Sequence, residues 1–253
     1  MKNVWNNANF GFKNRIARMA LLRSEPRKLN RSFGGLRASL LLALTAGWMG
    51  VASSEAAVLL EENFTFTGAL TSNGWTAANA GGTSVINAST PSLSYTGLAS
   101  SGIGGAASLT TSGEDDRRTF TSQSGDVYAS CLINLSAAQA TGDYFFMLSS
   151  GTTGFICRVF AKSSGSGFVL GLSKSTSTAA YDSTVLNFNT TYLVVIKIAK
   201  NAVTTLDDVS SLWVNPVLGG SETTPLLTST TTNDQATVDS VIVRQGNASN
   251  ALP

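Results

Sequence analysis

The side chains that could do acid–base or metal chemistry in this chain are mainly carboxylates, because the sequence contains no histidine. That absence excludes Ser-His and Cys-His catalysis, His-ligated zinc and the commonest general base. The most compact acidic group is Glu114-Asp115-Asp116, in which Glu114 and Asp116 share one face of an extended segment. Arg117 and Arg118 follow directly, and we expect them to keep both carboxylates ionised, which is unsuited to a general acid. The pattern favours a turn closed by local ion pairs over a catalytic pair.

Other nucleophile schemes are missing from the sequence. It has no Ser-x-x-Lys, no Gly-x-Ser-x-Gly and no phosphate-binding Gly-x-x-x-x-Gly-Lys motif. We therefore predict no catalytic residues and no enzymatic activity. The remaining route to a hydrolase is a carboxylate pair assembled from distant strands, such as Glu114 with Asp143.

Calcium needs only oxygen ligands, so acidic residues in loops are candidates for holding it. No Asp-x-Asn-x-Asn-Gly loop organises them, and the adjacent pair Asp207-Asp208 fits a strand start or a turn cap better. The sequence predicts no cofactor, although it allows a structural calcium ion. The candidate ligands are Asp143, Asp182, Asp207, Asp208, Asp234 and Asp239.

Aromatic rings are where sugar binding would show, because the C–H face of a sugar stacks on an exposed ring. Each ring taken alone fits an ordinary core position better, so the sequence leaves the ligand-binding residues unknown. Phe145 and Phe146 are consecutive, and in a regular strand they point to opposite faces, so one of them must leave the core or meet a second layer. The candidate platforms are Trp75, Tyr95, Tyr144, Tyr181 and Trp213.

The charge of the chain is divided between two segments. Residues 1–56 carry nine Lys or Arg against two Glu, whereas residues 57–253 carry eight Lys or Arg against 13 Asp or Glu. The basic charge thus lies ahead of residues 38–52, an uncharged and mostly apolar run that is too short for a membrane span and typical of a signal peptide. Small residues then lead to a predicted cleavage after Ala56, and Met19 is an alternative start. The basic pI is therefore no sign of nucleic-acid binding.

The segment 57–253 is predicted to be one domain that is secreted, with no membrane span after cleavage of the leader at 1–56. Ser and Thr make up 56 of its 197 residues, which is typical of an extracellular β-protein. Short apolar runs separated by Gly, Ser, Asn and Thr predict about 11–13 antiparallel strands in an all-β jelly-roll sandwich. Within 126–135, alternation predicts one buried and one exposed face. The expected strands are 58–66, 93–96, 106–111, 117–122, 126–135, 143–149, 154–162, 167–174, 191–200, 208–214 and 238–244.

The two cysteines, Cys131 and Cys157, are predicted to be free and buried. A meander would place the strand at 143–149 between their strands. Two strand spacings, about 9.6 Å, exceed the roughly 7 Å between Cα atoms that a disulfide spans.

The stretch from Gly113 to Pro216 resembles the laminin-G and concanavalin A-like modules of secreted or surface proteins of Bacteroidetes and related bacteria. The resemblance extends over most of 58–247 and implies a jelly roll of twelve or more strands, while implying little about activity. The matching features are Ser94-Tyr95-Thr96-Gly97, Gly113-Glu114-Asp115, Arg118-Thr119-Phe120, Val127-Tyr128-Ala129-Ser130, Ala137-Ala138-Gln139-Ala140-Thr141-Gly142-Asp143-Tyr144-Phe145-Phe146, Asn189-Thr190-Thr191-Tyr192-Leu193 and Val214-Asn215-Pro216.

Two departures from this class affect the functional interpretation. Its glycosidases carry a Glu-x-Asp-x-x-Glu strand, and the motif is absent here, because Glu114-x-Asp116 is followed by Thr119 where the second Glu would stand. The family pattern also continues into a closing strand beyond Pro253. We therefore expect that the chain is C-terminally incomplete and that the strand at 58–66 has an open edge.

The leading functional hypothesis is a secreted, non-catalytic β-sandwich that acts as a carbohydrate-binding or adhesion-type module at the cell surface, with a polysaccharide or surface glycan as partner. A structural spacer without a ligand is the alternative, and a glycoside hydrolase is a third. An aromatic row on one sheet face would favour binding, whereas hydroxyls and small side chains there would favour the spacer.

Overall fold

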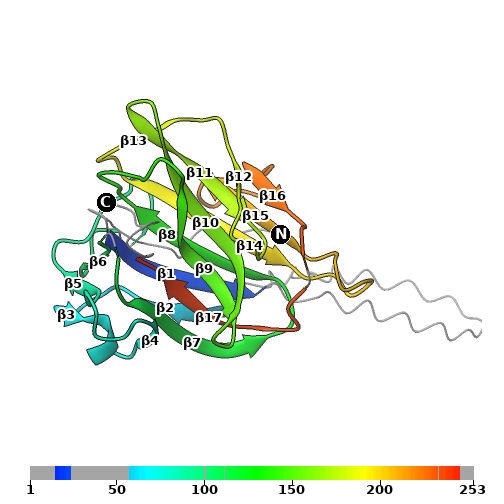
Figure 1. The fold of residues 1–253 in the computed structure, drawn as a ribbon, viewed down its shortest axis with the longest axis horizontal. Coiled ribbons are helices and arrows are strands. Elements are labelled where there is room, and N and C mark those ends of the chain that lie inside the picture. Colours follow the sequence, from blue (N-terminus) through cyan, green and yellow to red (C-terminus); the bar gives the residue numbers. More distant parts are fainter. Residues whose placement is uncertain (1–14, 24–56, 100, 111, 233, 246–253) are drawn as a thin grey trace, which may run out of the picture.

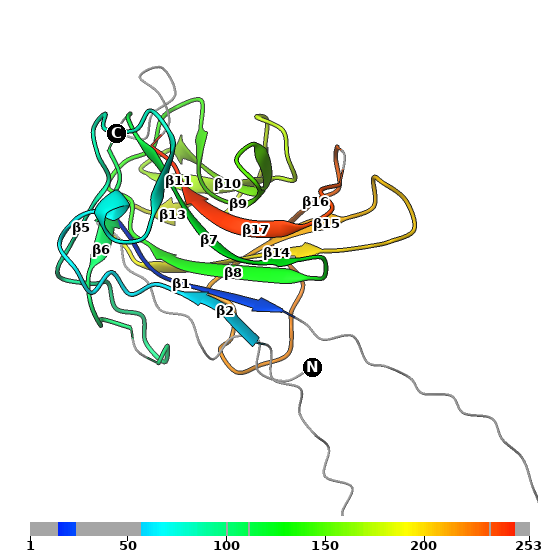
Figure 2. The same ribbon diagram turned by 90° about the horizontal axis from the view of Figure 1, so that it is seen from below.

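The fold consists of strands and loops, with a single 3-10 turn, η1 (Leu70–Ser72), among the described residues. The computed structural model describes residues 15–23, 57–99, 101–110, 112–232 and 234–245, and for 15–23 the backbone alone (Figure 1). Its strands form two antiparallel sheets that lie face to face (Figure 2). The predicted all-β class and β-sandwich character are confirmed, while the jelly-roll connectivity stays a prediction.

The first sheet has nine strands in the order β16-β15-β14-β8-β1-β6-β5-β3, with β2 also paired to β1. Its long central strands β8 and β14 come from the apolar runs that the sequence marks most clearly. The strands are β1 (Arg15–Arg23), β2 (Ala57–Glu61), β3 (Gly68–Ala69), β5 (Asn87–Ser89), β6 (Ala106–Ser108), β8 (Val127–Ile133), β14 (Tyr192–Ala199), β15 (Val209–Val214) and β16 (Leu227–Ser229).

The second sheet has eight strands in the order β12-β11-β10-β9-β17-β7-β4, with β13 also paired to β11. It carries most of the side chains that matter below. The strands are β4 (Thr76–Asn79), β7 (Asp115–Gln123), β9 (Asp143–Ser150), β10 (Gly154–Ser164), β11 (Gly167–Ser173), β12 (Ala180–Tyr181), β13 (Leu186–Asn187) and β17 (Val238–Val243).

Three of the expected strands differ clearly from the structure. Residues 93–96 form no strand, the strand expected at 106–111 ends at Ser108, and the strand expected at 58–66 ends at Glu61. Beyond it, the carboxylate of Glu62 turns inward and accepts hydrogen bonds from Phe64 N at 2.8 Å and Trp75 Nε1 at 3.1 Å. A buried acceptor of this kind replaces ladder partners, so the chain leaves the sheet there.

The strand β1 lies within the segment predicted to be a leader. Its backbone pairs with β8 on one side and with β2 and β6 on the other. The expected open edge of the strand at 58–66 is therefore paired with β1 on one side. The predicted cleavage after Ala56 stays a prediction, and the apolar run at 38–52 lies outside the described residues.

The core fills the space between the sheets with aliphatic and aromatic side chains, each of which contributes about 1.5–3 kcal/mol when fully buried. Cys131 on β8 and Cys157 on β10 are both free and buried, which confirms the predicted thiols. The reason differs from the expected meander, because β8 and β9 lie in different sheets. Burial raises the pKa of Cys157 to about 12, so this thiol stays protonated.

The expected half-burial of the strand at 126–135 is wrong, since all seven residues of β8 are buried. Tyr128 and Ser130 lie on the face predicted to be exposed. The hydroxyl of Tyr128 donates to Glu222 in a distant loop, and Lys197 lies 4.9 Å from the centre of its ring. A covering loop of this kind leaves no periodic signal in the strand it covers.

Phe145 and Phe146 are both buried in the inter-sheet core, against the expectation that one of them would leave it or meet a second layer. The pairing of β9 with β10 shows why. Phe146 pairs with Val159 and Tyr144 with Phe160, so β9 has one extra residue, Phe145, between two consecutive partners. This β-bulge lets two neighbouring side chains face inward and turns Tyr144 to the opposite face.

Candidate functional site

A row of aromatic side chains crosses the face of the eight-stranded sheet that is turned away from the core, called here the outer face. Tyr144 on β9 pairs with Phe160 on β10, Phe160 with Gly171 on β11, and Gly171 with Tyr181 on β12. Directly paired residues share a face, so these four positions form one line across four strands. The ring centres of Tyr144 and Phe160 are 5.3 Å apart, and those of Phe160 and Tyr181 are 6.3 Å apart.

Two glycines seat the ring of Tyr181. A Cβ atom on Gly171 would lie 2.8 Å from the ring, and one on Gly142 would lie 2.0 Å from the hydroxyl oxygen. Gly142 also has a φ of +78°, a conformation that side chains with a Cβ rarely adopt. The ring is therefore held against the backbone, while Tyr144 and Tyr181 both remain partly exposed.

Cationic side chains surround the row. The guanidinium carbon of Arg158 lies 4.8 Å from the centre of the Tyr144 ring, and that of Arg244 lies 4.0 Å from it. Lys162 Nζ lies 5.3 Å from the centre of the Tyr181 ring. A guanidinium that stacks on an aromatic face keeps its N–H edge available for hydrogen bonds. Burial lowers the pKa of Arg158, and its buried Nε has no hydrogen-bond partner among the described residues.

Arg244 is fixed by two carboxylates. Its guanidinium donates to Asp143 Oδ2 at 2.6 Å and lies 3.6 Å from Asp115 Oδ2. Asp115 also accepts from Gln245 N at 3.0 Å. Burial, the largest influence, raises the pKa of Asp115 to about 6 although Arg244 opposes it. Asp143, a candidate calcium ligand and the proposed partner of Glu114 in a hydrolase, thus contacts an arginine instead.

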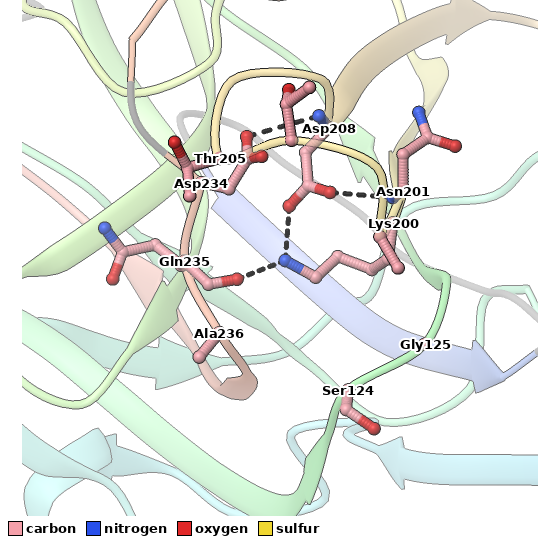
Figure 3. A pocket seen from close by; sticks show the side chains of 11 residues that line it. Ser124, Gly125, Lys200, Asn201, Thr205, Asp208, Asp234, Gln235 and Ala236 are labelled. Atoms are coloured by element: carbon pink, nitrogen blue, oxygen red, sulfur yellow. Dashed lines mark hydrogen bonds and ion pairs between the residues drawn. The ribbon is translucent and has the colours of Figure 1, made fainter.

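The structure brings together Asp207, Asp208 and Asp234, three of the six calcium candidates. They lie in loops beside a pocket of about 430 Å³ (Figure 3). The other candidates lie elsewhere: Asp182 accepts from Thr184 N at 2.6 Å, and Asp239 accepts from Gly151 N at 3.0 Å.

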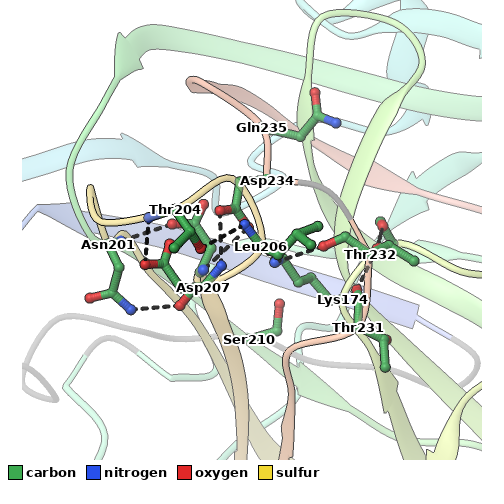
Figure 4. A network of polar contacts seen from close by, with 12 residues as sticks. Lys174, Asn201, Thr204, Leu206, Asp207, Ser210, Thr231, Thr232, Asp234 and Gln235 are labelled. Atoms are coloured by element: carbon green, nitrogen blue, oxygen red, sulfur yellow. Dashed lines mark hydrogen bonds and ion pairs between the residues drawn. The ribbon is translucent and has the colours of Figure 1, made fainter.

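Two lysines already stand in this acidic cluster. The ammonium group of Lys174, whose side chain is 1 % exposed, donates to Asp234 and to the carbonyl of Thr232 (Figure 4). Lys200 donates to Asp208 and to the carbonyl of Gln235 (Figure 3). These ammonium groups occupy the positions where a metal ion would compensate the negative charge.

Backbone amides complete the cluster. Asp234 accepts from the amides of Asp207 and Asp208, and Asp208 accepts from the amide of Asn201. Burial alone would raise the pKa of Asp234, but the hydrogen bonds from Lys174 and these amides outweigh it and hold the pKa below its usual value. Among the buried side-chain oxygens of the three aspartates, Asp207 Oδ1 alone lacks a partner in the described residues.

Glu114 and Asp116 share a face as expected, but the arginines do not bind them. Arg118 donates to Glu62 and to Asn73 O, both at 2.8 Å. Both oxygens of Asp116, and Oε1 of Glu114, are buried without a hydrogen-bond partner among the described residues. Burial, followed by the charge of Glu114, raises the pKa of Asp116 to about 7. The expected turn closed by local ion pairs, with both carboxylates held ionised by the arginines, is thus wrong.

Of the remaining aromatic candidates, the two tryptophans are buried and Tyr95 is partly exposed. Trp75 and Trp213 are 2 % and 3 % exposed, and their indole N–H groups donate to Glu62 and to Thr223 O. Tyr95 packs against the core at its edge. Of the five platforms, Tyr144 and Tyr181 therefore stand together on one face.

The sequence reasoning missed the cations beside these rings. Arg158 and Lys162 flank Phe160 at a spacing of two, so all three lie on one face of β10. That alternation of cation, ring and cation is readable in the sequence. The neighbouring rings are not, because Tyr144 depends on the bulge in β9 and Tyr181 lies on a two-residue strand.

Comparison with known proteins yields no match to a family model, a curated protein or a solved structure. Among the described residues, no helix is long and apolar enough to cross a membrane. The resemblance to laminin-G modules therefore stays a prediction.

Proposed function

We propose that this protein is a secreted, non-catalytic module that binds a polysaccharide or cell-surface glycan through the outer face of the eight-stranded sheet. The supporting observation is the line of Tyr144, Phe160 and Tyr181 across neighbouring strands. The partly exposed rings of Tyr144 and Tyr181 offer an apolar surface for the C–H face of a sugar, and Phe160, which is 2 % exposed, packs between them. The adjacent cations and carboxylates offer hydrogen bonds to hydroxyl groups.

The position of the row supports recognition more than a structural role. Side chains that serve packing alone lie in the core, whereas Tyr144 and Tyr181 are partly exposed on the opposite face. A ring held by Gly142 and Gly171 loses little conformational freedom when a ligand binds, which favours affinity. A spacer would need no such ordered surface.

The test is retention of the full chain on a panel of neutral and charged polysaccharides. We expect Tyr181→Ala to weaken binding at least tenfold, because it removes the stacking surface, and Tyr181→Phe to keep affinity within about threefold, because the ring remains. The melting temperature of each variant establishes that it is folded. If the folded chain binds no glycan at all, the spacer is the correct interpretation and the proposal is wrong.

A further inference from the structure

The cations of the domain fall into two groups. Residues 57–245 contain eight Lys or Arg residues. Five of them form ion pairs within the protein: Arg118, Lys174, Lys197, Lys200 and Arg244. Among the described residues, the other three, Arg117, Arg158 and Lys162, form none.

All three lie on the outer face. Arg158 and Lys162 flank Phe160 on β10. Arg117 on β7 pairs with Ile242 on β17, and Ile242 pairs with Met147 on β9, the first residue after the bulge that faces outward. The three cations thus extend over four adjacent strands, or about 14 Å at ordinary strand spacing.

The carboxylates nearby do not neutralise them. Asp143 and Asp115 both contact Arg244 and hold it against Tyr144. Counting these groups, the outer face carries four cations and two carboxylates around the aromatic row. The local charge is positive, whereas residues 57–253 as a whole carry a surplus of five negative charges.

The orientation of Arg158 is suited to an oxyanion. Its guanidinium lies against the rings of Tyr144 and Phe155, at 4.8 and 5.4 Å from their centres. Stacking fixes the plane of the group and leaves its N–H edge to bind a carboxylate or sulfate in a bidentate manner. Its buried Nε has no acceptor from the described residues, and a bound oxyanion would supply one.

We propose that the ligand of the outer face is an anionic polysaccharide, one that carries carboxylate or sulfate groups on its sugar rings. The rings of Tyr144 and Tyr181 contact the sugars, and Arg158, Lys162 and Arg117 bind the anionic groups. This inference rests on the proposed glycan-binding function and adds the class of glycan.

The test compares polysaccharides that share a backbone and differ in charge. Polygalacturonate is measured against its methyl ester, and dextran sulfate against dextran, with the full chain at about 150 mM NaCl so that weak surface attraction is screened. We expect the carboxylated or the sulfated member to bind at least tenfold more tightly than its neutral partner, and the stronger pair identifies the anionic group.

Variants separate a built site from general charge attraction. Arg158→Gln and Lys162→Gln should each weaken binding of the preferred polyanion about tenfold. Lys197→Gln is the matched control, since it removes the same charge on the other sheet, and should change affinity less than twofold. Equal losses in all three variants, or equal binding of charged and neutral partners, would overturn the inference while leaving glycan binding intact. If the folded chain binds none of the four polysaccharides and no neutral glycan, both proposals are wrong.

Discussion

The outer face and the acidic loop cluster hold similar side chains in opposite conditions. In the cluster, Lys174 and Lys200 are each bonded to a carboxylate and a backbone carbonyl. On the outer face, Arg158 and Lys162 contact aromatic rings and form no ion pair with a carboxylate of the described residues. Charged groups that form ion pairs within the protein stabilise its loops, whereas charged groups that lack a protein partner are available to a ligand.

Judged by residue type alone, the acidic loop cluster would be the better candidate for a ligand site. The ion pairs of the two regions favour the outer face instead. Asp207, Asp208 and Asp234 were calcium candidates because they are acidic residues in expected loops, and the structure places them close together beside a pocket. Their negative charge is largely balanced by two ammonium groups and their oxygens by backbone amides. The outer face has fewer carboxylates, and it carries the cations that form no ion pair among the described residues.

The largest effect is expected from breaking the cluster. Lys174→Met removes a buried ammonium and leaves Asp234 facing the backbone without its cation, which should cost about 3–5 kcal/mol of unfolding free energy. Urea denaturation measures this loss. Glycan binding by the folded fraction should be unchanged, and a loss below about 1 kcal/mol would mean that the network does not hold these loops.

Asp116 differs from the aspartates of the cluster, because its carboxyl group is buried without a hydrogen-bond partner among the described residues. Its pKa in the fold, about 7, lies above the value of about 3.9 expected when unfolded. A raised carboxyl pKa means that the fold binds the proton more tightly, so stability falls as the pH rises from about 4 to about 7. Between pH 4 and pH 8, we expect the free energy of unfolding of Asp116→Asn to rise by about 3 kcal/mol relative to that of the native chain.

Unfolding curves at several pH values measure this gain. Asp239→Asn is the control, since that aspartate accepts hydrogen bonds from Gly151 N and lies outside the buried group. A gain of the same size in both variants would show that net charge, and not the buried carboxyl of Asp116, causes the effect.

The smallest effect is expected from calcium. A site with a dissociation constant of 0.1 mM would stabilise the fold by about 2.7 kcal/mol at 10 mM Ca²⁺. Because Lys174 and Lys200 already balance two of the three carboxylates, we expect a melting-temperature shift below about 1 °C. A rise of several degrees that disappears in Asp234→Asn would show that the cluster exchanges a lysine for the ion.

Periodicity in the sequence was sufficient to predict the long strands. The runs at 154–162, 167–174 and 191–200 became β10, β11 and β14 with shifts of one or two residues at their ends. Local pattern could not predict Tyr144 on the outer face, since a one-residue bulge in β9 decides it. Short strands such as β12 form because a longer neighbour supplies the pairing, which local composition does not record.

The candidate sites depended on contacts between distant segments. Asp207, Asp208 and Lys200 share the loop between β14 and β15, but Lys174 and Asp234 come from distant segments of the chain. Arg118 was expected to hold Glu114 and Asp116, yet it binds Glu62, 56 residues away. Alternation along β7 turns Arg117 away from these carboxylates, but it leaves Arg118 on the face of Asp116, where Glu62 and the carbonyl of Asn73 take its hydrogen bonds.

The most direct test is to locate the ligand by backbone amide NMR of the full chain titrated with a defined oligogalacturonate. We predict the largest shift changes at Tyr144, Arg158 and Tyr181 and none at Asn201 and Asp208. Shift changes confined to the loops around the pocket at Asp208 would contradict binding at the outer face, because they would place the ligand where the charged groups already form ion pairs within the protein.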